Sequence, residues 1–203
     1  NGGNLTLDTV TVQNSAPTIY GVFRIDPAAV SHVTFTNSQF KNNTASGSSS
    51  GVITMNGASG STLTINGCLF DTNSGGTGYA GALVLQGSGT VTIDGSTFNS
   101  NSMAGNGGAI SLVGGALTIT NSTFSSNRAT GHAGAILINS GTTGTINTST
   151  FDGNRASYTG TGGDGGAILN LGTLIINDST FTNNQTPISG MGQNGGALNA
   201  FGA

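Results

Sequence analysis

One short phrase returns along the chain at a nearly fixed interval, and this repetition limits the folds that the chain can adopt. Its clearest copy runs from Leu117 to Asn127, with Phe124 three residues before its end. Phenylalanine and asparagine recur together at steps of 26 to 30 residues. The copies contain Phe40, Phe70, Phe98, Phe124, Phe151 and Phe181, followed three residues later by Asn43, Asn73, Asn101, Asn127, Asn154 and Asn184, with Val12 in the first phenylalanine slot. A repeat of this length predicts a solenoid, in which each unit is one rung that buries its apolar face against its neighbours.

Apolar and polar residues alternate within each copy, as they do in a β-strand. Leu63 and Ile65 should face inward and Thr64 outward, and Asn66-Gly67 should form a bend. A second phrase lies between the copies and places glycine where the backbone turns sharply or approaches another segment closely. Its copies start at Gly21, Gly51, Gly81, Gly108, Gly134, Gly166 and Gly196. Because the segments are short, β-branched and interrupted by glycine, helices are not expected.

These patterns predict an all-β fold, a right-handed single-stranded parallel β-helix of about seven coils. Crossovers between parallel strands of one sheet are nearly always right-handed. Rungs spaced by about 4.8 Å would give a rod about 34 Å long. We expect a single domain over residues 1–203, with rungs near 1–20, 21–49, 50–78, 79–105, 106–131, 132–162 and 163–192 and an open half-rung at 193–203.

The repeated asparagines are expected to form a buried ladder beside the stacked phenylalanines. Each amide would bond backbone groups of its own turn and the asparagine above it. A row of ligands is the alternative interpretation, but buried polar groups are usually satisfied within the protein. Cys68 occupies the slot that Ser38, Ser96, Ser122, Ser149 and Ser179 hold in other copies, and should be a small core residue.

Low charge restricts the partners of the chain. Only 5% of residues are charged, and the four cations are Arg24, Lys41, Arg128 and Arg155. Nucleic acid is not an expected partner, since phosphate binding needs clustered cations. No apolar run of about 18 residues is present, so no membrane-spanning helix is expected. Weak self-repulsion instead favours association with further copies or a place within a larger polymer.

The residues capable of chemistry do not form a catalytic group in the sequence pattern. His32 and His132 fall one rung before Cys68 and two rungs after it. Asp71 and Asp152 share one slot but fall three rungs apart, about 14 Å, too far for the carboxylate pair of a glycosidase. We therefore predict a non-enzymatic protein without catalytic residues or cofactor, with a polysaccharide-active β-helix enzyme as a distant alternative. The single carboxylate in Gly162–Gly166 is too little for calcium, so no metal site is predicted.

Two outward columns of threonine are also predicted. The first contains Thr6, Thr34, Thr64, Thr92, Thr118 and Thr145 and breaks at Ile175; the second contains Thr11, Thr97, Thr123, Thr150 and Thr180 and is interrupted by Gln39 and Leu69. Regular threonine arrays could match ice or a crystalline polysaccharide, but threonine is also a good strand residue that stacks on itself. Because the two columns flank the bend, we expect that they do not form one flat face.

Glycine-rich and Phe-x-x-Asn phrases occur as pairs over nearly the whole chain. Two examples are residues 107–110 with 124–127, and residues 165–168 with 181–184. These pairs resemble the repeats of chlamydial polymorphic outer-membrane proteins and, more broadly, the β-helical passenger domains of bacterial surface adhesins. The resemblance implies an extracellular or surface-displayed β-helix with adhesive or structural work, and supplies no catalytic residues. Such an adhesin fragment would bind cell-surface or glycan ligands through its variable loops.

Both ends of the chain interrupt a rung, and we expect a mature product or an excised piece of a longer protein. Leu5, Leu7, Leu198 and Phe201 look like core residues at uncapped ends, whereas solenoids usually end in polar caps. A head-to-tail contact between such ends is heterologous and does not close, so it yields a filament. The leading hypothesis is therefore an extracellular structural protein whose copies stack end to end into a surface fibre.

Overall fold

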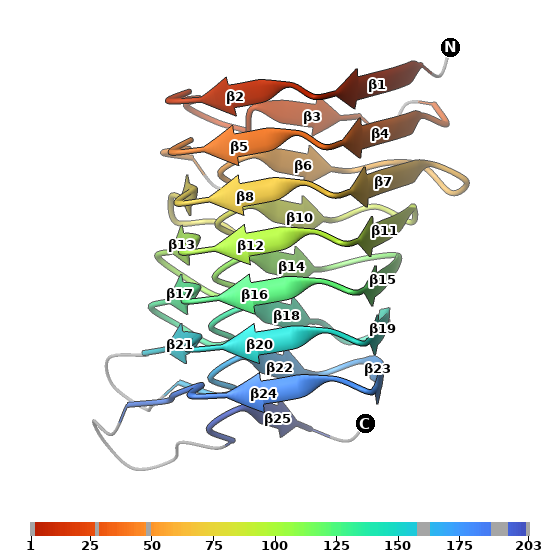
Figure 1. Ribbon diagram of the computed structural model, residues 1–203. Coiled ribbons are helices and arrows are strands. Elements are labelled where there is room, and N and C mark those ends of the chain that lie inside the picture. Colours follow the sequence, from red (N-terminus) through yellow and green to blue (C-terminus); the bar gives the residue numbers. More distant parts are fainter. Residues whose placement is uncertain (1–2, 27–28, 48–49, 158–162, 188–194, 202–203) are drawn as a thin grey trace.

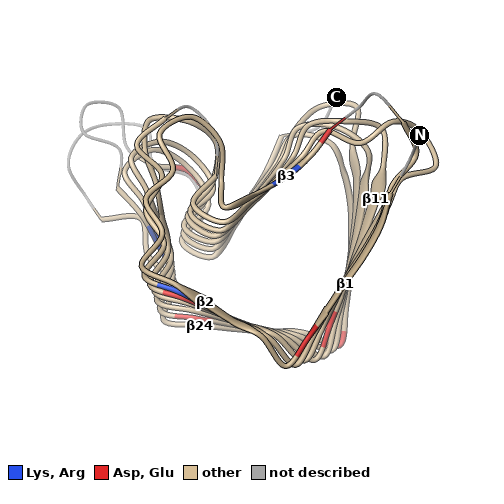
Figure 2. Ribbon diagram, turned by 90° about the horizontal axis from the view of Figure 1, so that it is seen from above, with Lys and Arg blue, Asp and Glu red and all other residues tan. Residues whose placement is uncertain are grey.

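Short parallel strands stack as the rungs of a solenoid (Figure 1). The computed structural model describes residues 3–26, 29–47, 50–157, 163–187 and 195–201. Viewed from the first rung, the chain runs clockwise as it recedes along the axis, so the coil is right-handed (Figures 1 and 2). The predicted fold class is confirmed. Residues 158–162, at the end of the predicted rung 132–162, and parts of the open half-rung at 193–203 lie outside the described residues.

Three sheets of seven strands each run the length of the described solenoid. The first sheet contains β1 (Asn4–Asp8), β4 (His32–Thr36), β7 (Thr62–Asn66), β11 (Thr90–Asp94), β15 (Ala116–Thr120), β19 (Thr143–Asn147) and β23 (Thr173–Asn177). The second contains β2 (Thr11–Gln13), β5 (Gln39–Lys41), β8 (Leu69–Asp71), β12 (Thr97–Asn99), β16 (Thr123–Ser125), β20 (Thr150–Asp152) and β24 (Thr180–Thr182). Each rung thus places one strand in each of these sheets.

The third sheet returns the chain to the start of the next rung. It contains β3 (Phe23–Ile25), β6 (Ile53–Met55), β10 (Leu83–Leu85), β14 (Ile110–Leu112), β18 (Ile136–Ile138), β22 (Ile168–Asn170) and β25 (Leu198–Ala200). A shorter fourth sheet lies between the second and third along the rung. Its strands are β9 (Ser74–Gly75), β13 (Ser102–Met103), β17 (Arg128–Ala129) and β21 (Arg155–Ala156).

Identical residue types lie above one another because the sheets pair in parallel and in register. Phe98 pairs with Phe70 on one side and Phe124 on the other, and all three are fully buried. From Phe40 to Phe181 the ring centroids of successive phenylalanines lie 4.6–4.9 Å apart in stacked geometry. A shift of one residue would turn every inward side chain to solvent, so the repeated phrase fixes the register.

The bend between the first and second sheets uses left-handed backbone in every rung. Gly67, Gly95 and Asn121 have φ of 59°, 54° and 51° there, while Thr148 and Asp178 both have φ of 48°. Glycine and asparagine enter this region readily, but a β-branched residue is strained in it. The bend also separates the two predicted threonine columns onto differently oriented sheets (Figure 2), as the sequence indicates.

Replacement of the strained Thr148 by asparagine should therefore stabilise the solenoid. We expect Thr148→Asn to raise the free energy of unfolding by about 1 kcal/mol, because Thr148 is exposed and the change relieves the backbone. Urea denaturation followed by circular dichroism measures the effect. The reciprocal change Asn121→Thr in the preceding rung should lower stability by a similar amount. Equal stability of both variants and the native chain would show that this strain is negligible.

The outline of each rung is indented where the glycine phrase leads into the third sheet (Figure 2). Two consecutive glycines serve different purposes in this indentation. Gly107 has φ of 73° and makes the turn. Gly108 then passes directly against β17, where an added Cβ would lie 2.7 Å from the backbone nitrogen of Arg128. Both reasons offered by the sequence, a sharp turn and a close approach, therefore apply, one to each glycine.

Candidate functional site

The repeated asparagines form a continuous hydrogen-bonded ladder along the inside corner of the second sheet. The side-chain amide of Asn101 donates to the carbonyl oxygen of Phe70 at 2.9 Å and to Oδ1 of Asn127 at 3.0 Å. Its own Oδ1 accepts from the backbone N–H and the side-chain amide of Asn73 at 3.1 and 2.9 Å. Asn101 is completely buried. Every polar atom of this side chain is thus used within the protein, which leaves no lone pair directed at a ligand.

The direction of these bonds differs from the sequence-based expectation. We expected each amide to bond backbone groups of its own turn, but the backbone partners belong to the preceding rung. Asn73, for example, donates to the carbonyl of Phe40 at 2.9 Å, 33 residues earlier. The reason is that the corner residue leaves the sheet ladder, so its side chain must supply the bonds between rungs that the backbone no longer makes. The ladder therefore joins rungs rather than closing turns.

A second polar ladder, which the sequence did not reveal, lies at the bend before each phenylalanine. Ser122 Oγ donates to the carbonyl of Thr120 at 2.8 Å and accepts the N–H of Ser96 at 3.2 Å. Cys68 keeps the same pattern, since Sγ donates to the carbonyl of Asn66 at 3.3 Å. We interpreted this slot as a core position for a small residue. The presence of serine in nearly every copy nevertheless indicates a repeated hydrogen bond. Cys68 is a member of a bonding column rather than a nucleophile.

Chemical labelling should find Cys68 unreactive in the folded chain. Its side chain is 2% exposed, and burial raises the pKa of the thiol above its usual value. The reactive thiolate is therefore disfavoured at neutral and mildly alkaline pH. We expect no alkylation by iodoacetamide at pH 8 without denaturant and rapid, complete alkylation in urea, as read by mass spectrometry. Equal rates in both conditions would contradict the burial of this rung.

The carboxylates and histidines considered as catalytic candidates do not come together. Asp71 and Asp152 share one column with two rungs between them, and Asn99 in that gap donates to Asp71 at 2.7 Å. Hydrogen bonds from Thr182 and Asn183 hold the pKa of Asp152 below its ordinary value, as expected for a stably ionised carboxylate. A general acid would need the opposite shift.

His32 and His132 are separated from Cys68 and from each other. Nδ1 of His32 lies 2.9 Å from the Thr62 hydroxyl on the outside of the first sheet. Nδ1 of His132 lies 3.3 Å from Oδ2 of Asp164 and accepts the backbone N–H of that residue at 3.1 Å. Within the described part of the chain, no three histidine, cysteine or acidic side chains form a cluster that could hold a metal ion. Gly162 of the segment Gly162–Gly166, which the sequence analysis judged insufficient for calcium, lies outside the described residues.

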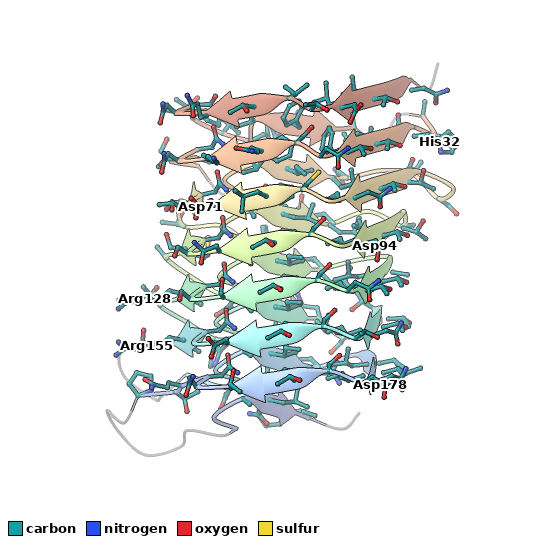
Figure 3. All side chains as sticks on the ribbon, viewed as in Figure 1. His32, Asp71, Asp94, Arg128, Arg155 and Asp178 are labelled. Atoms are coloured by element: carbon teal, nitrogen blue, oxygen red, sulfur yellow. The ribbon has the colours of Figure 1, made fainter. Side chains whose placement is uncertain are left out.

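Charged side chains lie at separate places on the rod (Figure 3). Arg128 and Arg155 are neighbours in register and project from one edge, whereas Asp94 and Asp178 lie toward the opposite edge. Arg24 forms an ion pair with Asp26 at 3.2 Å. The structure thus brings two cations together that the sequence treats as separate, but it makes no extended basic surface.

The first and last rungs expose apolar residues, and the columns of Leu5 and Leu198 are buried in the rungs between them. Leu5 and Leu198 are 41% and 40% exposed, and Phe201 is 46% exposed, whereas Leu7 is partly buried against the core. A cavity of about 220 Å³ opens beside Leu5 and Phe23 at the first rung, and one of about 230 Å³ opens beside Leu198 at the last. Strands β1, β2 and β3 each form one edge of their sheets, and β23, β24 and β25 the other.

The paired phrases of the chain match a known repeat family. Residues 95–112 and 148–171 match the Chlamydia polymorphic membrane protein repeat. The resemblance noted from the sequence is therefore confirmed. Each matched segment runs from the serine column through the asparagine ladder and the glycine phrase to the third sheet. Comparison with curated proteins and with solved structures gave no significant match. None of the described segments is a helix long and apolar enough to cross a membrane.

Proposed function

We propose that this solenoid, whose repeats are similar to those of polymorphic membrane proteins, is a non-enzymatic rod displayed at a cell surface. Copies of the rod stack end to end through their first and last rungs. The repeat match supports surface display, because polymorphic membrane proteins are surface-associated. The uniform, fully hydrogen-bonded columns favour a mechanical or adhesive role over catalysis. The observation that carries end-to-end growth is the pair of open sheet edges with exposed apolar residues.

The two edges are complementary in register. A copy stacked below the last rung would place its β1 against β23, with Leu5 next to Leu174 and Leu7 next to Ile176. Each of these residues already lies in the column that the new contact would extend. Leu5 would be covered by this contact, and Leu198 would be covered by β3 of the added copy. The result is a heterologous contact that repeats without closing, which is the geometry of a fibre.

Analytical ultracentrifugation of residues 1–203 tests the proposal. We expect elongated assemblies that grow with protein concentration. Leu5→Lys should prevent them, because it places a charge at the apolar edge, whereas Thr6→Lys on the outward side of the same strand should not. A native chain that remains monomeric at every concentration, or equal assembly of the two variants, would contradict end-to-end stacking.

The repeat match favours a second candidate, a passenger-type adhesin module that binds host-cell or glycan surfaces through its lateral loops. Cell binding by the Leu5→Lys variant separates the candidates. An adhesin that acts through its sides keeps full binding when the end contact is blocked, while a fibre that binds through avidity loses it.

A further inference from the structure

The outer face of the first sheet carries a two-dimensional array of threonines. The predicted threonine column runs down the middle of this face, but its partner is not the column across the bend. The partner lies two residues earlier on the same strands, as Thr62 with Thr64 in β7, Thr90 with Thr92 in β11 and Thr143 with Thr145 in β19. In β15 between them Thr118 is paired with Ala116. We call these paired outward positions, 62 and 64, 90 and 92, 116 and 118, and 143 and 145, the threonine lattice.

Two repeat distances define the threonine lattice. Along the axis, residues in register are separated by the rung spacing, which the stacked phenylalanine rings set at 4.6–4.9 Å. Along each strand, alternate residues are about 6.7 Å apart. Viewed down the axis, the strands of this sheet lie over one another but fan apart toward the loops that precede them (Figure 2). The lattice is therefore regular in both directions and gently twisted.

The lattice hydroxyls are available for an external partner. Thr62 bonds His32, but within the described residues the hydroxyls of Thr92, Thr118 and Thr145 form no hydrogen bond with the protein. Thr92 and Thr118 are exposed. This differs from the serine column at the bend, where each hydroxyl is used internally. β-Branched side chains have few χ1 rotamers, so hydroxyl and methyl groups are held in order before any partner arrives.

The chemistry of the lattice selects the partner. Its positions on these four strands carry no charge and no aromatic ring, and only Asp94 borders it on β11. A sugar-binding platform would need an aromatic side chain to cover the apolar face of the sugar ring. A rigid repeat of neutral hydroxyl and methyl groups instead matches a ligand that is itself a crystal of small hydrogen-bonding units. Both lattice distances are close to oxygen–oxygen repeats of hexagonal ice.

We infer that the threonine lattice is an ice-binding face. Water molecules bound between hydroxyls of adjacent rungs continue the order of the lattice into the crystal. Each contact is weak, but simultaneous contact of many fixed groups with one rigid surface makes the attachment strong. This activity uses the side of the rod and is independent of the ends used in the proposed assembly.

Thermal hysteresis and ice recrystallisation, measured on residues 1–203 at the same concentration for every variant, test the inference. We expect the native chain to depress the freezing point below the melting point and to keep ice grains small. Thr118→Lys in the middle of the lattice should abolish both effects. Thr150→Lys is the matched control, because it places the same charge at an exposed position on the second sheet.

Melting curves by circular dichroism establish that both variants are folded, and a fluorescently labelled chain reports directly whether it enters a growing ice hemisphere. Loss of incorporation in Thr118→Lys alone supports the inference. A native chain without ice activity, or equal loss in the two variants, overturns it. Binding to microcrystalline cellulose or chitin that depends on Thr118, without binding to ice, would assign the lattice to a polysaccharide and also overturn it.

Discussion

Gly108→Ala should be the most damaging single substitution in the solenoid, lowering the free energy of unfolding by about 4 kcal/mol or more. The new Cβ would lie 2.7 Å from two backbone atoms of Arg128 and would overlap the carbonyl oxygen of Gly134. Neither neighbour is a flexible side chain, so the rungs must separate. Far-ultraviolet circular dichroism during urea denaturation measures the loss, with reduced solubility at expression as a second sign.

A matched glycine on the surface provides the control for this clash. Gly95 also has a special backbone conformation, with φ of 54°, but an added Cβ there meets no atom within 4 Å. Asparagine already occupies the equivalent bend at Asn121. Gly95→Asn should therefore change stability by less than about 1 kcal/mol. If Gly108→Ala were equally mild, the close approach of the glycine phrase to β17 would be wrong.

Asn101→Ala should cost about 3–5 kcal/mol, since it leaves several buried groups without partners. The N–H and the side-chain amide of Asn73 lose their acceptor, and the carbonyl of Phe70 and Oδ1 of Asn127 lose a donor. Water cannot replace these bonds in a fully buried column. Thermal and urea denaturation of the variant measure the cost.

Asn99 gives a control of the same residue type in the same rung. Its side chain lies on the outer side of the second sheet, where it bonds Asp71 and Ser125 and remains half-buried. Because solvent can satisfy the partners that it leaves, Asn99→Ala should cost less than about 1 kcal/mol. Similar losses for the two variants would mean that the inner ladder is no more important than surface hydrogen bonds.

The repeated phrase carries enough information to predict the stacking of rungs. Asparagine follows phenylalanine by three residues in each of the six Phe-x-x-Asn copies, as Asn101 follows Phe98, so the phenylalanine and asparagine columns are aligned together. Alternation of apolar and polar residues decides which side of each strand faces the core. Parallel pairing then follows, because each copy has the same chain direction. This is why the fold class, the phenylalanine stack and the threonine column of the first sheet could be read from the residues alone.

Features that depend on the path between phrases could not be predicted in the same way. Loop lengths vary, so the sequence does not place the glycine phrase against β17 or reveal the short fourth sheet. The column that contains Thr62, which lies beside the Thr64 column on the same face, was missed. Its positions hold His32 and Ala116 in other rungs, so the column lacks a constant residue type. The bonds between successive asparagines were predicted correctly, but the bonds from their amides to the backbone were assigned to the wrong rung, because these depend on where the backbone leaves the sheet.

The most direct test of the stacked register is a distance between two sites far apart in sequence. Thr34 and Thr145 lie in one column, four rung steps apart. Spin labels attached to cysteines at these positions, in a chain with Cys68→Ser, can be measured by double electron–electron resonance. The account predicts one narrow distribution near 19 Å, broadened only by the label linkers. A broad distribution, or one centred beyond about 30 Å, would contradict the stacked solenoid.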